Sequence, residues 1–403
     1  MRQQRRDHTM STPEHSLLPL LWGALQHVMF PSRPIVGACL VLGSLACCVG
    51  CADSLPNVSV LRVPDGGTLP QVAVDEADTI HLVYYSGSMS FGDLFHATMH
   101  PGTSDWSEPQ RINSTPRSVT GLGPTDGGQF TIGPDGRLHV VWFHRAPPRF
   151  YYTRSDHTGR FETQKILSRK FEDGVESGPT LAVDHAGAVY VFWHADPVED
   201  AQRRVYGTVS RDNGVHFDSP RTVNLPAAGA CACCGIRAVA NVKGTISVAY
   251  RSAGDNVNRD MRLLTSTNEG RTFTDRLIQP WTLGACPVAT TTLSTGPQGT
   301  VVGWETEGQV YLANTEHVEE ATLPPGVAEF RRKNPTVAVN HRGQTLLAWG
   351  DGPGFQSGGQ LYWHLFDDRG RPRGQQNSTS TLIPPRSLPS TAARNDGSFV
   401  LVY

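Results

Sequence analysis

One arrangement of apolar and polar positions recurs along the chain. A small or polar residue leads into a short apolar strand, a turn that usually contains glycine follows, and a second apolar strand ends in an aromatic residue. Alternating strands bounded by turn residues predict paired β-strands. Seven copies of this pattern span Pro70–Tyr84, Gln129–Trp142, Pro179–Trp193, Ile236–Tyr250, Ala289–Trp304, Pro335–Trp349 and Ser390–Tyr403.

The spacing of these copies indicates the architecture. Their closing aromatic residues lie 45 to 58 residues apart, a period typical of propeller blades with four strands. Further apolar strands stand between the copies, and no stretch after residue 55 keeps a helical period of 3.6 residues. We therefore predict an all-β propeller of four-stranded blades, with seven blades by the repeat count and six as the alternative.

The ends of the chain predict how the ring closes. The seventh copy runs directly to the C-terminus, so its sheet lacks outer strands of its own. The apolar segment 57–63 can supply the missing strand and cover an edge that would otherwise invite aggregation. Residues 52–403 are thus expected to form a single propeller domain.

The first 51 residues have the pattern of an export segment. Residues 35–50 are uncharged and apolar, and Arg33 stands just before them. This run is shorter than the ~20 residues of a membrane span and matches a secretory signal. Val49-Gly50-Cys51 resembles a bacterial lipoprotein cleavage box, which implies a lipid on Cys51 and a periplasmic or cell-surface location. Cleavage without lipid stays open, as does a true start at Met29.

Composition narrows the classes of partner. The chain has 35 Lys and Arg against 37 Asp and Glu, a formal net charge of -2, whereas nucleic-acid binders normally have a basic excess. We therefore expect no nucleic-acid partner, and contact with a membrane only through the lipid anchor. The 41 glycines and 29 prolines fit many turns between short strands.

Three turns resemble the Asp box of sialidase-like (BNR-repeat) propellers. They are Ser210-Arg-Asp-Asn-Gly-Val-His-Phe217, Ser266-Thr-Asn-Glu-Gly-Arg-Thr-Phe273 and the degenerate Ser155-Asp-His-Thr-Gly-Arg-Phe161. The short polar side chains of such turns bond the turn backbone, and glycine takes the positive φ. The resemblance implies a fold and says nothing of chemistry.

A second resemblance extends over residues 60–403 and is sharpest over residues 228–312. Cys231-Ala-Cys-Cys-Gly235 and the later Cys286-Pro287 are similar to segments of a group of exported bacterial BNR-repeat proteins. Members of that group are called sialidase-like by fold, and the resemblance transfers no activity.

Sialidase chemistry is one hypothesis for this chain. A sialidase grips a sugar carboxylate with three arginines and needs a Tyr–Glu nucleophile pair and a carboxylic acid. Arg62, Arg237, Arg259 and Asp260 are weak catalytic candidates, and Arg251 is a further candidate for the arginine triad. No nucleophilic tyrosine with a glutamate partner can be assigned, so an exo-α-sialidase type of hydrolase is the alternative function.

The cysteines give the leading hypothesis. Cys231, Cys233 and Cys234 precede the first strand of the fourth copy, and Cys286 precedes that of the fifth. These positions are expected at neighbouring points on the channel mouth. In an oxidising compartment the four thiols can form disulfides, hold copper or zinc, or act as a redox-active pair. A scaffold stapled by disulfides is therefore a second alternative function.

Polar residues are expected around the same mouth. The ligand-binding candidates are Arg237, Asn258, Arg259, Asp260, Glu305 and Glu307. Comparable positions in other copies hold Asp126, Asp173, Glu176, His194, Asp196 and Lys333. Each of these can simply be a solvated loop charge. Grouped on one face, they indicate a non-catalytic site for a carbohydrate-type or small ligand, or for a metal ion.

Overall fold

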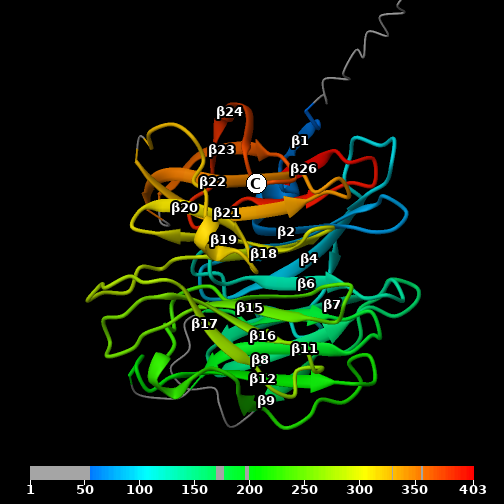
Figure 1. Cartoon of the computed structure of the whole chain (residues 1–403). Helices are drawn as coiled ribbons and strands as arrows, with labels where there is room; N and C mark the ends of the chain where they lie inside the picture. Colours follow the sequence, from blue (N-terminus) through cyan, green and yellow to red (C-terminus); the bar gives the residue numbers. More distant parts are fainter. Residues whose placement is uncertain (1–54, 169–176, 196–198, 329, 355–356) are drawn as a thin grey trace, which may run out of the picture. The chain divides into compact units, whose positions relative to one another are not determined.

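The computed structural model describes residues 55–168, 177–195, 199–328, 330–354 and 357–403 (Figure 1). All of them belong to one compact unit, Asp53–Tyr403. Within these ranges no helix is both long enough and apolar enough to cross a membrane. The expected export segment 1–51, with Cys51, lies outside the described ranges, as do the candidates Asp173, Glu176 and Asp196.

The described strands form seven sheets, each built mainly from antiparallel neighbours. The first contains β2 (Thr68–Val74), β3 (Ile80–Gly87), β4 (Gly92–Met99) and β5 (Gln110–Arg111). The second contains β6 (Gly128–Ile132), β7 (Leu138–Arg145), β8 (Pro148–Arg154) and β9 (Lys165–Ser168). The third contains β10 (Thr180–Val183), β11 (Val189–Ala195), β12 (Arg204–Ser210) and β13 (Arg221–Thr222). The fourth contains β14 (Arg237–Ala240), β15 (Ile246–Arg251), β16 (Met261–Ser266) and β17 (Thr274–Gln279).

The remaining three sheets differ in strand number among the described residues. The fifth contains β18 (Thr291–Gly296), β19 (Gly299–Thr306) and β20 (Gln309–Asn314), beyond which a single bridge joins Leu312 to Thr322. The sixth contains β21 (Arg331–Val339), β22 (Thr345–Gly354), β23 (Gly358–Phe366) and β24 (Pro372–Ile383). The seventh contains β25 (Ser390–Ala393), β26 (Phe399–Val402) and β1 (Val58–Leu61).

The first strands of the sheets make a closed ring. Each first strand contacts the first strand of the next blade, in the order β2, β6, β10, β14, β18, β21 and β25, and β25 in turn contacts β2. The structure is therefore a seven-bladed propeller, which confirms the predicted all-β fold of four-stranded blades and selects seven blades over six. The fifth and seventh blades depart from the pattern, with three strands each in the described part of the chain.

β1 lies in the same sheet as the end of the chain. It pairs in parallel with β26, from Val58 opposite Phe399 to Leu61 opposite Val402. Figure 1 shows the blue β1 beside the red β26. β1 occupies the third position of this sheet, so its partner is the second strand of the blade. The propeller is thus closed by strands from both ends of the described chain.

The aromatic residues that close the copies form the core between blades. Trp142, Trp193, Trp304 and Trp349 are at most 1% exposed. Three of these rings stack on a tyrosine of the adjacent third strand, as Trp142 does on Tyr151 with ring centroids 5.6 Å apart. Trp193 instead meets Phe150 of the preceding blade at 5.3 Å. The recurring aromatic position thus gives each blade a large buried ring, which contributes strongly to the hydrophobic core.

The turns that resemble Asp boxes join third strands to fourth strands. Ser210 Oγ accepts the Gly214 amide at 2.8 Å, and Asp212 Oδ1 accepts the His216 amide at 2.8 Å. Gly214 has φ 83°, a conformation that suits glycine. Phe217 then packs edge-on against Tyr152 of the preceding blade, with centroids 4.8 Å apart. These turns therefore stabilise blade contacts.

The first strands enclose a central channel of about 250 Å³. Each blade contributes a residue at the same position of its first strand to the channel wall. The residue opposite it on the second strand is the one just before the closing aromatic residue. We name these seven residues the channel ring: Gln71, Gln129, Thr180, Arg237, Thr292, Thr336 and Ser390. The four hydroxyls in this ring each accept a backbone N–H of the next blade, at 3.0 to 3.3 Å. Hydrogen bonds between first strands therefore help to hold neighbouring blades together.

Candidate functional site

Three of the cysteines lie on one tight turn before β14. The Cys234 amide donates to the Cys231 carbonyl at 3.4 Å, and the Cys231 amide donates to the carbonyl of Arg251 at the end of β15. The side chains are buried, with Cys231 and Cys234 at 0% exposure and Cys233 at 9%. The turn thus keeps the side chains of all three cysteines away from solvent.

The fourth cysteine comes from the loop between β17 and β18. Cys286 is exposed and forms a disulfide with Cys233, with Cα atoms 6.7 Å apart, while Cys231 and Cys234 are free thiols. The four sulfur atoms all lie within 4.8 Å of one another. From the alignment of the copies we expected Cys286 to lie within bonding reach of the other three cysteines. The Cα separation of 6.7 Å between Cys233 and Cys286 meets the ~7 Å limit for a disulfide. Neighbouring loops of two blades therefore build one compact four-sulfur site.

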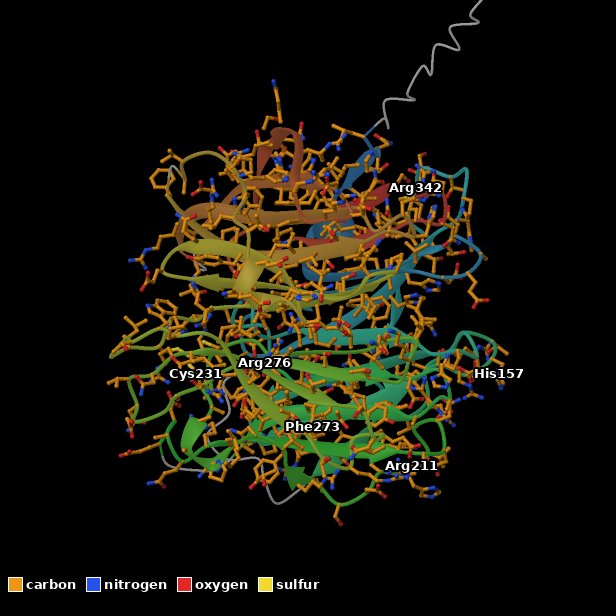
Figure 2. The ribbon with its side chains drawn as sticks, viewed as in Figure 1. His157, Arg211, Cys231, Phe273, Arg276 and Arg342 are labelled. Carbon is orange, nitrogen blue, oxygen red and sulfur yellow. A yellow bond between two sulfur atoms is a disulfide. The ribbon has the colours of Figure 1, made fainter. Side chains whose placement is uncertain are left out.

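The cysteine turn reaches towards the axis of the propeller. The Gly235 amide donates to the Ala289 carbonyl at 2.9 Å. A Cβ atom on Gly235 would lie 3.6 Å from Thr290 of the next blade and 3.8 Å from Thr125, which precedes β6 two blades away. In Figure 2 Cys231 lies on the opposite side of the view from His157 and Arg211, which belong to turns between third and fourth strands. The site therefore lies on the face where chain segments lead into the first strands.

A buried arginine supports both cysteine loops. Arg251 is 2% exposed and donates to the Arg259 carbonyl at 2.6 Å and to the Glu305 carbonyl. Its guanidinium also lies over the Trp281 ring, 5.1 Å from the centroid. Because all these groups surround one side chain, Arg251 fixes the cysteine turn against the fifth blade.

A buried ion pair holds the loop of Cys286. Lys333 Nζ lies 2.9 Å from Glu305 Oε1 and also donates to the carbonyls of Pro287 and Val288, at 3.2 and 3.4 Å. Glu305 is 3% exposed, and burial raises its pKa although Lys333 and Arg251 oppose the shift. Both charges are thus engaged in positioning the loop.

Arg259 and Asp260 are neighbours in the sequence but have different partners in the structure. Arg259 Nη1 lies 2.7 Å from Asp200 Oδ2 of the third blade, and Asp260 Oδ1 accepts the Trp281 amide at 3.0 Å. The Asp200 carbonyl also accepts the Ala230 amide at 3.1 Å, beside the cysteine turn. Asp200 is therefore a supporting residue that the sequence analysis missed.

The free thiols have different proton affinities. Hydrogen bonding to Cys234, together with burial, raises the pKa of Cys231. Burial opposes ionisation of Cys234 as well, but its hydrogen bond with Cys231 and the nearby Arg251 guanidinium outweigh it and lower the pKa of Cys234. A thiolate at Cys234 is thus favoured over one at Cys231.

The other candidates are dispersed. Arg237 lines the central channel. Asn258 lies in the loop after β15, where its backbone bridges to Gly254 and Thr282, and Glu307 is exposed in the turn between β19 and β20 with φ 54°. Arg62 is exposed just after β1, with its guanidinium 5.6 Å from the centre of the Tyr403 ring.

The buried candidates of other blades have structural contacts. His194 has Nδ1 3.1 Å from Ser177 Oγ, and burial lowers its pKa to about 3. Asp126 Oδ2 accepts the Leu122 amide at 3.1 Å. Of the arginines considered for a sialidase triad, Arg62 lies on Tyr403, Arg237 lines the channel, and Arg251 and Arg259 are engaged by other groups.

Comparisons with known proteins give low similarity. No family model matches the chain, and no curated protein matches it. A protein of unknown function from Dyadobacter fermentans is 13% identical, covering 74% of this chain and 95% of that chain with a TM-score of 0.49. A mutant of AofleA from Arthrobotrys oligospora is 10% identical, covering 78% of this chain and 87% of that one, also with a TM-score of 0.49. The NanB sialidase from Streptococcus pneumoniae is 9% identical, covering 83% of this chain and 64% of that chain with a TM-score of 0.44.

Proposed function

We propose that this protein is an exported, non-catalytic metal-binding propeller whose four cysteines hold one Cu(I) or Zn(II) ion. The observation that carries the proposal is the approach of all four sulfurs to within 4.8 Å of one another, from loops of two adjacent blades. Thiolates are the ligands that Cu(I) and Zn(II) prefer. The ion requires the reduced form of the Cys233–Cys286 pair.

The dimensions of the site fit such an ion. Zinc bound by four sulfurs at about 2.3 Å sets the sulfurs about 3.8 Å apart in a tetrahedron. Cys231 Sγ already lies 3.4 Å from Cys233 Sγ. Cys231 and Cys234 also stand in a Cys-x-x-Cys relation, with two residues between them, on a turn closed by an i to i+3 hydrogen bond, and their side chains are hydrogen-bonded to each other. The metal geometry therefore requires reduction of the Cys233–Cys286 bond and separation of these two sulfurs to about 3.8 Å.

The surroundings support a rigid site. Arg251 and the Lys333–Glu305 pair hold the loops that carry the cysteines. The sulfurs are therefore kept close together in the absence of an ion. Preorganised ligands lower the cost of binding. Two buried free thiols in an oxidising compartment would also be protected by a metal ion.

A disulfide-stapled scaffold is the second candidate, favoured by the Cys233–Cys286 bond itself. The two functions predict different chemistry for Cys286. In the scaffold Cys286 stays bonded to Cys233, and no ion is needed. In the metal site all four cysteines are thiolates.

The test combines elemental analysis with peptide-resolved alkylation of the full chain in denaturant, because Cys231 and Cys234 are buried in the folded protein. The metal site predicts about one copper or zinc per chain in protein purified without chelator, and alkylation of all four cysteines after chelator removes the ion. The scaffold predicts no stoichiometric ion and alkylation of Cys231 and Cys234 alone. Cys231→Ser and Cys233→Ser are matched variants: both should lose the ion if the metal proposal holds. If Cys233→Ser instead makes Cys286 reactive while no wild-type ion is found, the metal proposal is wrong.

A further inference from the structure

The channel ring contains one residue that differs in kind from the other six. Four members are threonine or serine, two are glutamine, and the fourth blade contributes Arg237. The hydroxyl members accept a backbone N–H of the next blade, as Thr180 Oγ1 does from Ala238 at 3.0 Å. A guanidinium has donors only and cannot take that role. Gln71, Gln129 and Arg237 instead each donate a side-chain N–H to the carbonyl of the preceding residue, so the arginine differs from the glutamines in its charge rather than in this contact.

The charge of Arg237 is unbalanced within the described residues. It is the one charged residue among those that line the channel in the described chain. No ion pair involving it occurs there, and its Nη1 donates to the carbonyl of the preceding Ile236 at 2.9 Å. Burial alone lowers its pKa to about 10. Arg237 is half-buried, and a charge that is partly withdrawn from bulk water is stabilised by a counter-charge beside it.

The channel offers further donors beside the guanidinium. Thr180 and Thr292 are the ring members of the blades on either side. Each hydroxyl oxygen already accepts a backbone N–H, from Ala238 at 3.0 Å and from Val337 at 3.3 Å. Because an oxygen that accepts from the backbone still carries its own hydrogen, both hydroxyls can donate towards the channel.

We propose that the central channel is a binding site for one small carboxylate or similar oxyanion, held by the Arg237 guanidinium and the hydroxyls of Thr180 and Thr292. Guanidinium forks match the geometry of a carboxylate, and hydrogen bonds to a charged acceptor are the strong ones. The volume of about 250 Å³ admits an anion of a few heavy atoms and excludes an oligosaccharide. This site is separate from the four cysteines, and it stands whether or not they bind a metal.

The probe is acetate, followed through its methyl signal by saturation-transfer NMR on the full chain. Acetamide is the neutral control of the same shape. A bulky sulfonate salt keeps the ionic strength constant. The wild-type chain should give a saturable signal with acetate and at least tenfold less with acetamide. Arg237→Gln should reduce the acetate signal at least tenfold. Arg342→Gln removes an exposed arginine outside the channel and should retain it.

A second measurement keeps the proposal testable without a variant. The Arg237 Nε–Hε resonance of the wild-type chain should shift on titration with acetate and stay in place with acetamide. Equal acetate signals in wild type and Arg237→Gln, or an Arg237 resonance that does not respond to acetate, would overturn the proposal.

Discussion

Buried charged residues near the cysteines form ion pairs with residues that are far away in the sequence. Arg259 is followed by Asp260, yet its partner is Asp200 in the preceding blade at 2.7 Å. The Asp260 carboxylate instead accepts the Trp281 amide at 3.0 Å. Partners 59 residues apart become neighbours because consecutive blades pack side by side. Sequence reasoning named Arg259 as a candidate but could not distinguish a binding residue from a structural one.

His194 gives a prediction at this scale. Its side chain is fully buried, Nε2 has no hydrogen-bond partner in the described residues, and burial lowers its pKa to about 3. Below the unfolded pKa of about 6.5 the unfolded chain gains a proton that the folded chain excludes, so stability falls as the pH drops from about 6.5 towards 3. We expect this residue to contribute about 2 kcal/mol of destabilisation between pH 7 and pH 5.

Urea unfolding at the two pH values measures this contribution. In His194→Asn the loss of stability between pH 7 and pH 5 should be smaller than in the wild type by about 2 kcal/mol. His341→Asn changes an exposed histidine and serves as the control. An unchanged pH dependence in His194→Asn would contradict the assignment.

At the scale of strands, the sequence predicted the repeat well and the exceptions poorly. Each predicted copy overlaps the first two strands of a blade, as Ser390–Tyr403 does with β25 and β26, because alternating apolar residues and a buried aromatic have a regular signature. The fifth blade lacks a fourth strand in the described residues, and no pattern in the sequence predicted this difference. The pairing of Cys233 with Cys286 also depends on how loops of two blades approach, so spacing alone left it open. The Cys-x-x-Cys relation of Cys231 and Cys234 was visible in the sequence and could have been used.

The hydrogen bonds between first strands lead to a second prediction. Thr336 Oγ1 accepts the Thr391 amide at 3.1 Å, and both residues are at most 8% exposed. Thr336→Val keeps the shape but leaves a buried N–H without its acceptor, which costs about 1–3 kcal/mol. Thr131→Val changes another channel-lining threonine that is less buried, and it should cost less than about 0.5 kcal/mol. Chemical denaturation of both variants checks the difference, and equal costs would contradict the role of the hydroxyl.

At the scale of the whole molecule, the predicted export would expose the cysteines to an oxidising compartment. We predict that residues 1–50 are removed and that Cys51 becomes the lipid-bearing first residue of the mature chain. Intact mass spectrometry of protein produced in a bacterial host that processes lipoproteins should give the mass of residues 51–403 plus acyl chains. A chain that keeps residues 35–50, or one cut elsewhere without lipid, would contradict the prediction.

One short strand from the start of the described chain completes the last blade. β1 joins β26 in parallel, and the Phe399 amide donates to the Asn57 carbonyl at 2.8 Å while the Tyr403 amide donates to the Leu61 carbonyl at 3.2 Å. Without β1 the strand β26 would present an unpaired edge, which exposes backbone groups to pairing with other chains. The first strand therefore stabilises the last blade and also protects its edge.

Ser59→Pro tests this closure. In the parallel ladder the bonded residues of β1 alternate, so Asn57, Ser59 and Leu61 face β26 and the Ser59 amide donates to it. Proline removes that donor and clashes with the partner strand, and we expect a loss of about 3 kcal/mol, increased aggregation and faster proteolysis ahead of β2. Ser59→Ala keeps the amide and should behave like the wild type in thermal unfolding and limited proteolysis. If Ser59→Pro is as stable and as protease-resistant as Ser59→Ala, β1 does not close the propeller.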